Sequence, residues 1–390
     1  MTGSKVLDRD SDAGKTRVCL FATVLRADDV RLFHRECKSL VKAGFDVHVV
    51  ICSDLSGTVD GVHFHAAGPA NNRLHRMLVK PWIVMWKALM IKAKIYHFHD
   101  PELLIVGFIM RWALSKRVVF DMRESTARQI MGKEYLPRWS RRVISLCYRV
   151  IEKVCLHGIS VVVANDRSAE EHKGAYLVRN FPEVDEELMA NAMDMSERLK
   201  SPLVVYVGGV WESRGALVYV ELARRLKQRG HKFRLMIIGQ HGADFGRQLT
   251  QMIQEVGLVG MVEVTGHVDY LKAMQVVSRA VIGLSILRPI PNYTFCLAGK
   301  MVEYMMCGTP VLASDFEHWR PYVEGEKVGR MVDPNNMEEI VNVCEQMLEN
   351  PDELAAMGRR GMEAVRRKYN WSLEFTELLR CYDDLLKKAS

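Results

Sequence analysis

Short apolar runs alternate with amphipathic segments along nearly the whole chain. Residues 18–24 and 47–52 have the apolar pattern of buried strands, and residues 30–42 between them place apolar side chains on one helical face. The same alternation predicts further strands at 96–99, 118–121 and 159–163, and helices near 101–115 and 137–157. Strands that alternate with helices in this way are typical of a parallel, doubly wound sheet.

The alternation stops at residues 183–200, which are acidic and polar, and then begins again. The later elements are a strand at 203–207, a helix at 216–228, strands at 233–238, 262–264, 281–285 and 311–314, and an all-helical tail from about 351. We therefore predict an α/β chain with two Rossmann-like doubly wound parallel-sheet domains and a cleft between them. The predicted divisions are a disordered tail (1–16), an N-terminal domain (17–182), a linker (183–200), a C-terminal domain (201–368) and a final helix (369–390) that could cross back to the N-terminal domain.

Composition agrees with two well-filled domains in a reducing compartment. The chain has 390 residues, of which 48% are hydrophobic, and this length exceeds what one core usually supports. Its nine cysteines form no Cys-x-x-Cys pair, which favours reduced thiols in a cytoplasmic protein. The first 16 residues lack the apolar stretch of a signal peptide. Their Asp-x-Asp spacings, at Asp8, Asp10 and Asp12, could suggest a metal site, but we expect a disordered tail.

Positive charge is concentrated in the first half. Residues 1–180 carry a net charge of +11 and the remainder −4, and residues 73–142 hold 15 basic against 5 acidic side chains. This asymmetry predicts attraction to an anionic surface; without a recognisable binding module, we do not expect that surface to be nucleic acid. Residues 81–94 mix tryptophans with lysines and are too often charged to span a bilayer. They could lie flat on anionic lipid or simply cover a sheet, whereas 103–114 is expected to be core.

Polar side chains follow the predicted strand at 96–99. His99, Asp100 and Glu102 come where that strand ends, so they should lie at the carboxyl edge of the sheet, where ligands bind in such folds. Asp100 could alternatively cap the following helix. His97 is expected to be structural, and a zinc site at the His-x-His is disfavoured because no third ligand follows at a recognisable spacing.

Two more strand ends supply candidate cleft residues. Arg123 and Glu124 follow the strand at 118–121, where a surface ion pair or helix capping is the alternative. Asp29 follows the first strand and is expected to cap the next helix, while Arg31 could point into the cleft.

The C-terminal half contains residues suited to a diphosphate. Gly208 and Gly209 form a turn that lets backbone approach a phosphate, and Arg214 supplies a cation with several donors. Lys300 opens a helix, and Glu303 lies three residues later, where its carboxylate could accept from sugar hydroxyls. Neither Gly-x-Gly-x-x-Gly nor a P-loop motif is present, which argues against dinucleotide and P-loop sites. The alternative for 299–314 is an ordinary helix-to-strand corner.

These residues resemble the large group 1 family of retaining GT-B glycosyltransferases that build bacterial surface polysaccharides. The matching stretches cover nearly the whole chain after residue 16, and the specific ones are His97 to Leu103 and Lys300 to Met305. Weaker matches are Asp29 to Arg31, Arg179 to Pro182, Val205 to Gly209, Arg214-Gly215, Ile238-Gly239, Gly329 to Pro334 and Met357 to Trp371.

The resemblance implies a nucleotide-sugar donor in the C-terminal domain, an acceptor on the N-terminal domain, retention at the anomeric carbon and no bound metal. The donor phosphate would act as the base, and stabilisation of the departing phosphate would drive transfer. The site residues expected on these grounds are His99, Asp100 and Arg123 for catalysis; Gly208, Gly209, Arg214, Gly239, Lys300, Met301 and Glu303 for the donor; and Asp29, Arg31, Glu102 and Glu124 for the acceptor.

Two positions depart from the family pattern. Many relatives have a second glutamate eight residues before Glu303, where this chain has Phe295, and many have histidine where it has Arg123. The first leaves the donor sugar open, although a UDP-sugar is favoured over a GDP-sugar. The hypothesis is a cytoplasmic transferase, peripheral on the inner face of a membrane, with a lipid-linked saccharide acceptor. The alternatives are a sugar-nucleotide epimerase on the same fold and a non-catalytic binding subunit.

Overall fold

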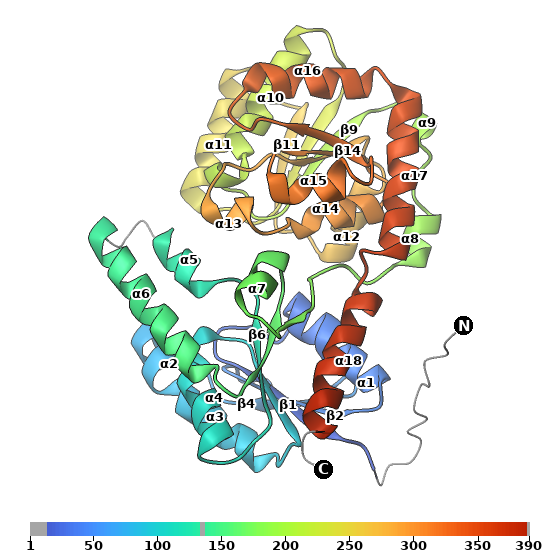
Figure 1. Ribbon diagram of the computed structural model, residues 1–390. Helices are drawn as coiled ribbons and strands as arrows, with labels where there is room; N and C mark the ends of the chain where they lie inside the picture. The colour runs from blue at the N-terminus through green and yellow to red at the C-terminus, as the bar shows by residue number, and fades with distance from the viewer. Residues whose placement is uncertain (1–13, 133–136, 388–390) are drawn as a thin grey trace. The chain divides into compact units, whose positions relative to one another are not determined.

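The computed structural model describes residues 14–132 and 137–387 (Figure 1). It divides into two compact units: the first comprises Met1–Asn180 together with Trp371–Ser390, and the second comprises Phe181–Asn370. The predicted tail at 1–16, including the aspartates at 8, 10 and 12, lies outside the described residues except for 14–16. No described helix has the length and hydropathy needed to cross a membrane.

The first unit is built on one eight-stranded sheet. The strand order is β3-β4-β2-β1-β5-β6-β7-β8, and all neighbours are parallel except the β3–β4 pair. The sequence pattern did not predict β3, β4 or β8, because these strands are short and lie at or next to an edge of the sheet. The strands are β1 (Arg17–Ala22), β2 (Asp46–Ile51), β3 (Gly57–Val59), β4 (Val62–Ala66), β5 (Ile95–Phe98), β6 (Val118–Met122), β7 (Ser160–Val163) and β8 (Tyr176–Leu177).

Helices cover both faces of this sheet, as a doubly wound fold requires. The π-helix η1 (Val30–Cys37), α1 (Lys38–Lys42) and the C-terminal α18 (Trp371–Lys387) contribute to one apolar cluster with β1 and β2. The opposite cluster takes its side chains from α3 (Lys80–Met90), the short η2 (Pro101–Leu103) and α4 (Leu104–Trp112). The remaining helices of the unit are α2 (Arg73–Leu78), α5 (Thr126–Met131), α6 (Arg138–Cys155) and α7 (Asp166–Glu171).

The C-terminal helix α18 belongs to the first unit, although it is 190 residues beyond the rest of that unit in the sequence. The side chains of Trp371, Leu378 and Tyr382 are buried in the first unit's core. The Trp371 indole Nε1 donates to Ser39 Oγ at 2.8 Å, so the start of α18 is fixed against α1 by a buried hydrogen bond.

The second unit has a six-stranded, fully parallel sheet in the order β11-β10-β9-β12-β13-β14. Its strands are β9 (Leu203–Val207), β10 (Arg234–Ile238), β11 (Val262–Gly266), β12 (Ile282–Ser285), β13 (Val311–Ser314) and β14 (Gly329–Val332). The longer helices are α10 (Ala216–Gln228), α11 (Ala243–Glu255), α12 (Tyr270–Val277), α14 (Gly299–Met306), α16 (Met337–Leu348) and α17 (Pro351–Arg367). The shorter ones are η3 (Glu212–Arg214), α13 (Pro291–Thr294), η4 (Glu317–Trp319) and α15 (Arg320–Val323).

Residues 183–200, expected to be a linker, are part of the second unit. They form α8 (Glu186–Ala190) and α9 (Met195–Arg198), whose Met189 and Met195 are buried. The guanidinium of Arg198 is also buried and donates to the carbonyl groups of Ala280, Cys307 and Gly308. The segment looks like a linker in sequence because it is polar. Its buried arginine, however, satisfies backbone carbonyl groups inside the unit.

The expectation that 103–114 is core was only half right. Leu104, Val106 and Met110 of α4 are buried against the sheet, but the side chains of Ile105 and Trp112 are about half exposed. The neighbouring α3 behaves in the same way: Val84 and Ala88 pack inward while its tryptophans remain exposed. An apolar helix therefore does not by itself reveal which of its faces meets the core.

Candidate functional site

Two strand ends of the second unit meet at a pair of glycines. Gly208 follows β9 and Gly239 follows β10, and both have positive φ angles, +137° and +151°. A Cβ on Gly239 would lie 1.7 Å from the Gly208 carbonyl oxygen, so no side chain fits there. The Gly208 N–H donates to the Ile238 carbonyl at 2.9 Å, which ties the two turns together. Glycine is thus required for this close approach, and it leaves backbone exposed at the carboxyl edge of the sheet.

Lys300 and Arg214 come from different elements and reach this same turn. A Cβ on Gly208 would lie 3.0 Å from the Lys300 amine, and one on Gly209 would lie 3.5 Å from Nη1 of Arg214. Arg214 lies at the end of η3, where its Nε donates to the Tyr293 hydroxyl at 3.2 Å. Lys300 lies in the first turn of α14. The structure therefore places both cations predicted for the diphosphate beside the glycine turn.

The amine of Lys300 is buried without a counter-charge in contact with it. It lies 3.8 Å from the centroid of the Tyr206 ring, and none of the described residues makes a hydrogen bond to it. Burial, together with the positive charge of Arg214, holds the pKa of Lys300 well below its ordinary value. A cation over an aromatic face is stabilised only in part, so an anion bound here would supply what the amine lacks.

Other predicted donor residues occupy the same helix with different exposures. Glu303 is partly exposed one turn after Lys300, as a contact to a sugar hydroxyl requires. Met301 was predicted to contact the donor, but its side chain is fully buried in the apolar core and its N–H donates to the Ala298 carbonyl. Its position in the helix turns it inward, which contradicts a side-chain contact. Phe295, at the end of α13, is partly buried.

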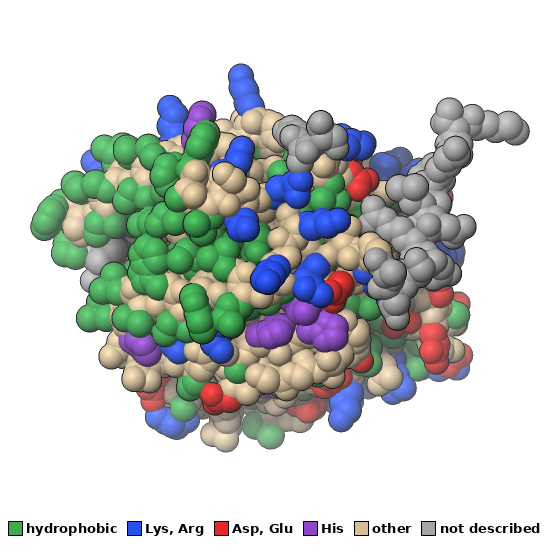
Figure 2. Space-filling view, turned by 90° about the horizontal axis from the view of Figure 1, so that it is seen from below, with side chains coloured by type: hydrophobic (Ala, Val, Ile, Leu, Met, Phe, Trp, Pro, Cys, Tyr) green, Lys and Arg blue, Asp and Glu red, His purple; other side chains and the backbone are tan. Residues whose placement is uncertain are grey.

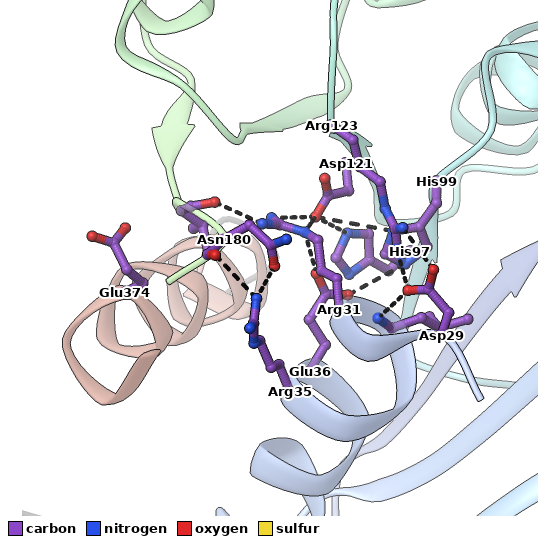
Figure 3. Close-up of polar contacts among 12 residues, drawn as sticks. Asp29, Arg31, Arg35, Glu36, His97, His99, Asp121, Arg123, Asn180 and Glu374 are labelled. Carbon is purple, nitrogen blue, oxygen red and sulfur yellow. Dashed lines mark hydrogen bonds and ion pairs between the residues drawn. The ribbon is translucent and has the colours of Figure 1, made fainter. Parts of the chain in front are cut away.

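The first unit holds a different arrangement, a buried network of charged groups (Figure 3). Arg31 of η1 donates to the Asp121 carboxylate through Nε at 3.0 Å and Nη2 at 2.7 Å, and its Nε lies 2.9 Å from Oε1 of Glu36. Its Nη1 donates to the Val178 carbonyl at 2.9 Å. Arg31 is only 2% exposed, so the acceptor contact predicted for it would require these partners to rearrange.

His97 and His99 lie beside these acids rather than at the surface. The two rings stack with centroids 4.7 Å apart, and His99 Nε2 is 3.3 Å from Oε2 of Glu36. His97 Nδ1 lies 2.9 Å from the Tyr382 hydroxyl of α18. His97 is structural in this sense, as its position in the strand suggested. Sequence reasoning missed Glu36, Asp121 and Tyr382, although charged residues on the apolar side of residues 30–42 were a usable signal.

Burial and charge pairing shift the pKa values of this network, upward for one acid and downward for the other acid and both histidines. Burial, with the nearby Asp121 carboxylate, holds the pKa of Glu36 well above its ordinary value. Burial acts on Asp121 in the same direction, but Arg31 together with the two histidines and Arg123 outweighs it, and the pKa of Asp121 is lowered. Burial lowers the pKa of His97 to about 4, and it lowers that of His99 well below the ordinary value. Both imidazoles are therefore neutral at pH 7.

Asp100 binds the end of β1 instead of capping the helix that follows it. Its carboxylate accepts from the backbone N–H groups of Thr23 at 2.5 Å and Val24 at 2.8 Å, and its side chain makes no capping bond. The capping alternative is therefore wrong. Glu102 accepts from the Thr23 hydroxyl at 2.6 Å and lies 3.3 Å from Nε of Arg76. Their predicted catalytic and acceptor-binding roles stay predictions.

Asp29 and Arg123 form a two-pronged ion pair at the partly exposed edge of this network. The nitrogens Nη1 and Nη2 of Arg123 donate to the two Asp29 oxygens at 3.0 Å and 2.7 Å. The Asp29 carboxylate also caps η1, as predicted, by accepting from the Leu32 N–H at 2.9 Å. Glu124 is exposed and accepts from Gln129. Arg123 therefore already has a carboxylate partner in the absence of substrate.

Comparison with known proteins identifies the second unit. Residues 193–364 match the family model of the glycosyl transferases group 1. The second unit therefore matches the group 1 glycosyltransferase family. The matched residues include the glycine turns, Arg214, Lys300 and Glu303, so the cationic turn lies within the part that defines the family.

Two curated relatives and one solved structure extend this glycosyltransferase assignment. The α-D-kanosaminyltransferase of Streptomyces kanamyceticus is 25% identical over 244 residues, which cover 58% of this chain but only 60% of the relative. The phosphatidyl-myo-inositol mannosyltransferase of Mycobacterium tuberculosis is 26% identical over 336 residues, or 84% of this chain and 80% of the relative. The Anabaena protein Alr3699/HepE, solved in complex with UDP, has a TM-score of 0.70 at 12% identity and covers 95% of this chain and all of its own. This structural likeness shows the shared GT-B fold.

Proposed function

We propose that the protein transfers a sugar, with retention, from a nucleotide-sugar donor to a lipid-linked saccharide acceptor. The observation that carries the proposal is the buried Lys300 amine, which lies with Arg214 at a glycine turn and has no hydrogen bond within the described part of the chain. Two cations at one turn match the charge of a diphosphate. The family match supports the reaction class, and the UDP complex of the Anabaena protein favours a UDP-sugar over a GDP-sugar.

Each donor-site residue has a separate task in this proposal. The backbone at Gly208, Gly209 and Gly239 lets the diphosphate approach, and Arg214 and Lys300 neutralise it. Glu303 accepts from hydroxyls of the ribose. As the bond between the anomeric carbon and the phosphate oxygen breaks, negative charge grows on the diphosphate, and the two cations stabilise it most at that stage. The same phosphate takes the proton of the acceptor hydroxyl, so we propose that no metal ion is needed.

Substitution of the two cations tests the donor site. We expect Lys300→Met and Arg214→Ala each to weaken UDP binding by about 1.5–3 kcal/mol, because each removes a hydrogen bond to a charged group. Arg234→Ala is the matched control, since Arg234 is an exposed cation of the same unit that pairs with Glu263. Calorimetry with UDP and GDP measures the effect and the base preference. Unchanged affinity in both cation variants would refute the assignment.

A transfer assay tests the reaction itself. Labelled nucleotide sugars, offered with and without a lipid extract, should give a labelled lipid product only when both protein and extract are present. Conversion of the nucleotide sugar without extract would instead identify an epimerase. A protein that binds UDP but labels nothing across a broad donor panel would be a binding subunit.

We also propose that the protein lies on the surface of a membrane, and an exposed apolar surface on the first unit supports this. We call it the apolar face (Figure 2). It extends over α2, α3, α4 and α6, which contact one another in succession. Trp86 is 59% exposed and Trp139 is 74% exposed, far more than a folded core requires. The other exposed members are Leu74, Met77, Leu78, Val79, Trp82, Met90, Ile105, Trp112, Leu114, Val143, Ile144, Leu146, Val150, Ile151 and Val154.

Cations accompany this face, which supports an anionic lipid surface as its proposed partner. Exposed Arg and Lys side chains occur on the same helices and the loops after them, and Figure 2 shows blue side chains along the edge of the green patch. Aromatic and aliphatic side chains beside lysine and arginine are the composition of helices that lie in a bilayer interface. The exposed cations are Arg73, Lys92, Lys94, Arg142, Arg149 and Lys153.

Flotation with lipid vesicles tests this surface. We expect the wild-type chain to float with phosphatidylglycerol vesicles and much less with phosphatidylcholine vesicles, and added salt should release it. The double variant W86E/W139E should remain at the bottom of the gradient. Val259→Glu is the control, because Val259 is 72% exposed but belongs to the second unit. Equal flotation of W86E/W139E and wild type would exclude the apolar face as the membrane contact.

A further inference from the structure

Four buried side chains of the first unit converge as metal ligands do. Glu36 comes from η1, His97 from β5, His99 from just after β5 and Asp121 from β6. One ligand atom of each lies within 4.8 Å of the others, and all four side chains are fully buried. We call them the His/acid cluster (Figure 3). No third ligand follows the His-x-His at a recognisable spacing because Glu36 and Asp121 come from other elements.

The inward-facing atoms of the His/acid cluster lack hydrogen bonds. Among the described residues, none bonds in this way to either Glu36 oxygen, His97 Nε2, either His99 nitrogen or Asp121 Oδ1. His99 Nε2 lies 3.3 Å from Glu36 Oε2, and His97 Nε2 lies 4.0 Å from Asp121 Oδ2, the oxygen that Arg31 also binds. The carboxyl groups of Glu36 and Asp121 also interact with each other. Buried polar atoms are normally satisfied, so this group is missing a partner that accepts several lone pairs at once. A cation is such a partner.

Tyr382 and Arg31 orient two members of the cluster so that their free atoms can bind a cation. When the Nδ1 hydrogen of His97 is donated to the Tyr382 hydroxyl at 2.9 Å, the Nε2 lone pair faces Asp121. Arg31 orients Asp121 through its Oδ2 and leaves Oδ1 unbonded. Outer hydrogen bonds of this kind fix the tautomer and direction of metal ligands. Arg31 compensates the charge of one carboxylate, so the carboxyl group of Glu36 releases its proton when a cation binds.

We propose that Glu36, His97, His99 and Asp121 bind a divalent transition-metal ion of the zinc class. Two imidazole nitrogens and two carboxylate oxygens suit such an ion, and four protein ligands leave no open position, which makes the site structural. Bonds of about 2.0–2.2 Å require tetrahedral ligand atoms about 3.3–3.5 Å apart, so the 4.0 Å contacts must shorten slightly. The ion would tie η1 to β5 and β6, whose ends carry Asp100 and Arg123. His99 is then a positioning residue.

This site is separate from the proposed donor site, whose residues belong to the other unit, and it does not depend on the proposed function. The test uses the full chain without a polyhistidine tag, stripped with a chelator and then titrated with Co²⁺ or Zn²⁺. We expect one bound ion per chain and the intense visible absorption of tetrahedral Co²⁺. Glu36→Gln and His97→Gln should weaken binding at least tenfold. His231→Gln is the control, because His231 belongs to a more exposed group with Glu345 and Glu349.

Two further measurements keep the proposal falsifiable if the ligand variants do not fold. Tyr382→Phe leaves all four ligands in place, and we expect it to weaken Co²⁺ binding about tenfold through His97. X-ray absorption of the zinc-loaded wild type should show two imidazoles, oxygen ligands and no sulfur. Sulfur ligation would mean that cysteines bind the ion and would overturn the assignment. So would the absence of stoichiometric binding, which would show that a shared proton alone satisfies the cluster.

Discussion

The two units bury charge in opposite ways. In the first unit, the buried Arg31 contacts Asp121 and Glu36, and the partly buried Arg123 contacts Asp29. In the second unit, the buried amine of Lys300 meets an aromatic ring and another cation. In the first arrangement, the charge of each of these two guanidinium groups is compensated by a carboxylate. The second arrangement destabilises the unliganded protein, because the buried amine has no opposite charge in contact. Such arrangements are typical of binding sites, where a ligand provides the missing charge.

Removing one partner from each region should separate these roles, and the largest effect is expected in the first unit. Asp121→Asn leaves Arg31 buried with a weaker partner, so we expect the free energy of unfolding of the metal-free first unit to fall by about 3–5 kcal/mol. Lys300→Met removes a buried charge without a carboxylate partner in contact, so the unliganded second unit should be as stable as wild type or more stable. Hydrogen exchange in urea, read by mass spectrometry, follows each unit separately. An equal loss in both variants would erase the proposed distinction.

Substitution at the glycine turn should reduce the free energy of unfolding nearly as much as substitution at the Arg31–Asp121 ion pair. Gly239→Ala places a Cβ 1.7 Å from the Gly208 carbonyl oxygen at a φ of +151°, and we expect it to destabilise the second unit by about 3 kcal/mol. Gly257→Ala is the control: it also has a positive φ, +68°, but no atom lies within 4 Å of the added Cβ. It should cost only about 1–2 kcal/mol. Comparable losses in the two variants would show that φ strain alone explains the glycines.

The sequence predicted the glycine-turn side of this comparison well because the main strands and helices there have clear periodic patterns. Strands β9 and β13 and helix α10 begin and end where the pattern placed them, and Arg214 and Lys300 each follow shortly after a strand end or open a helix. Parallel strands bring such positions to one edge of a sheet. Local pattern was therefore enough to bring together residues that are far apart in the chain.

The buried cluster of the first unit could not be predicted by the same reasoning. Glu36 lies three residues after Phe33, on the apolar side of residues 30–42, but its position alone does not show which side chains of β5 and β6 it meets. Tyr382 reaches His97 across a separation of 285 residues, on a helix that no local pattern assigns to the first sheet. The exposure of the apolar side chains of α6 could not be predicted either. An amphipathic pattern shows which side of a helix is apolar, but not whether another element covers that side.

The displaced pKa of Lys300 gives a prediction that reports on charge directly. Its pKa in the folded protein is lowered well below the ordinary value of 10.5. Between the folded and the ordinary pKa, the unfolded chain binds more protons than the folded one. The stability of the unliganded second unit therefore rises with pH in that window. A bound diphosphate favours the ammonium form, so UDP binding in that window should take up as much as one proton. Calorimetry in buffers of different ionisation enthalpy measures this uptake. Lys300→Met should abolish it, and buffer-independent heats for the wild type would contradict the proposed contact.

The smallest expected effect concerns the attachment of α18 to the buried network. Tyr382→Phe removes a hydroxyl whose partner, His97 Nδ1, is fully buried, and we expect a loss of about 0.5–1.5 kcal/mol in the metal-free first unit. Tyr176→Phe removes a hydroxyl that donates to Asp384 at 2.7 Å in a partly exposed position, where water can replace it. Hydrogen exchange of α18 should therefore quicken more in the first variant than in the second. The reverse order would mean that α18 is held at its exposed edge, and that the network beneath it is not what fixes the C-terminal helix to the first unit.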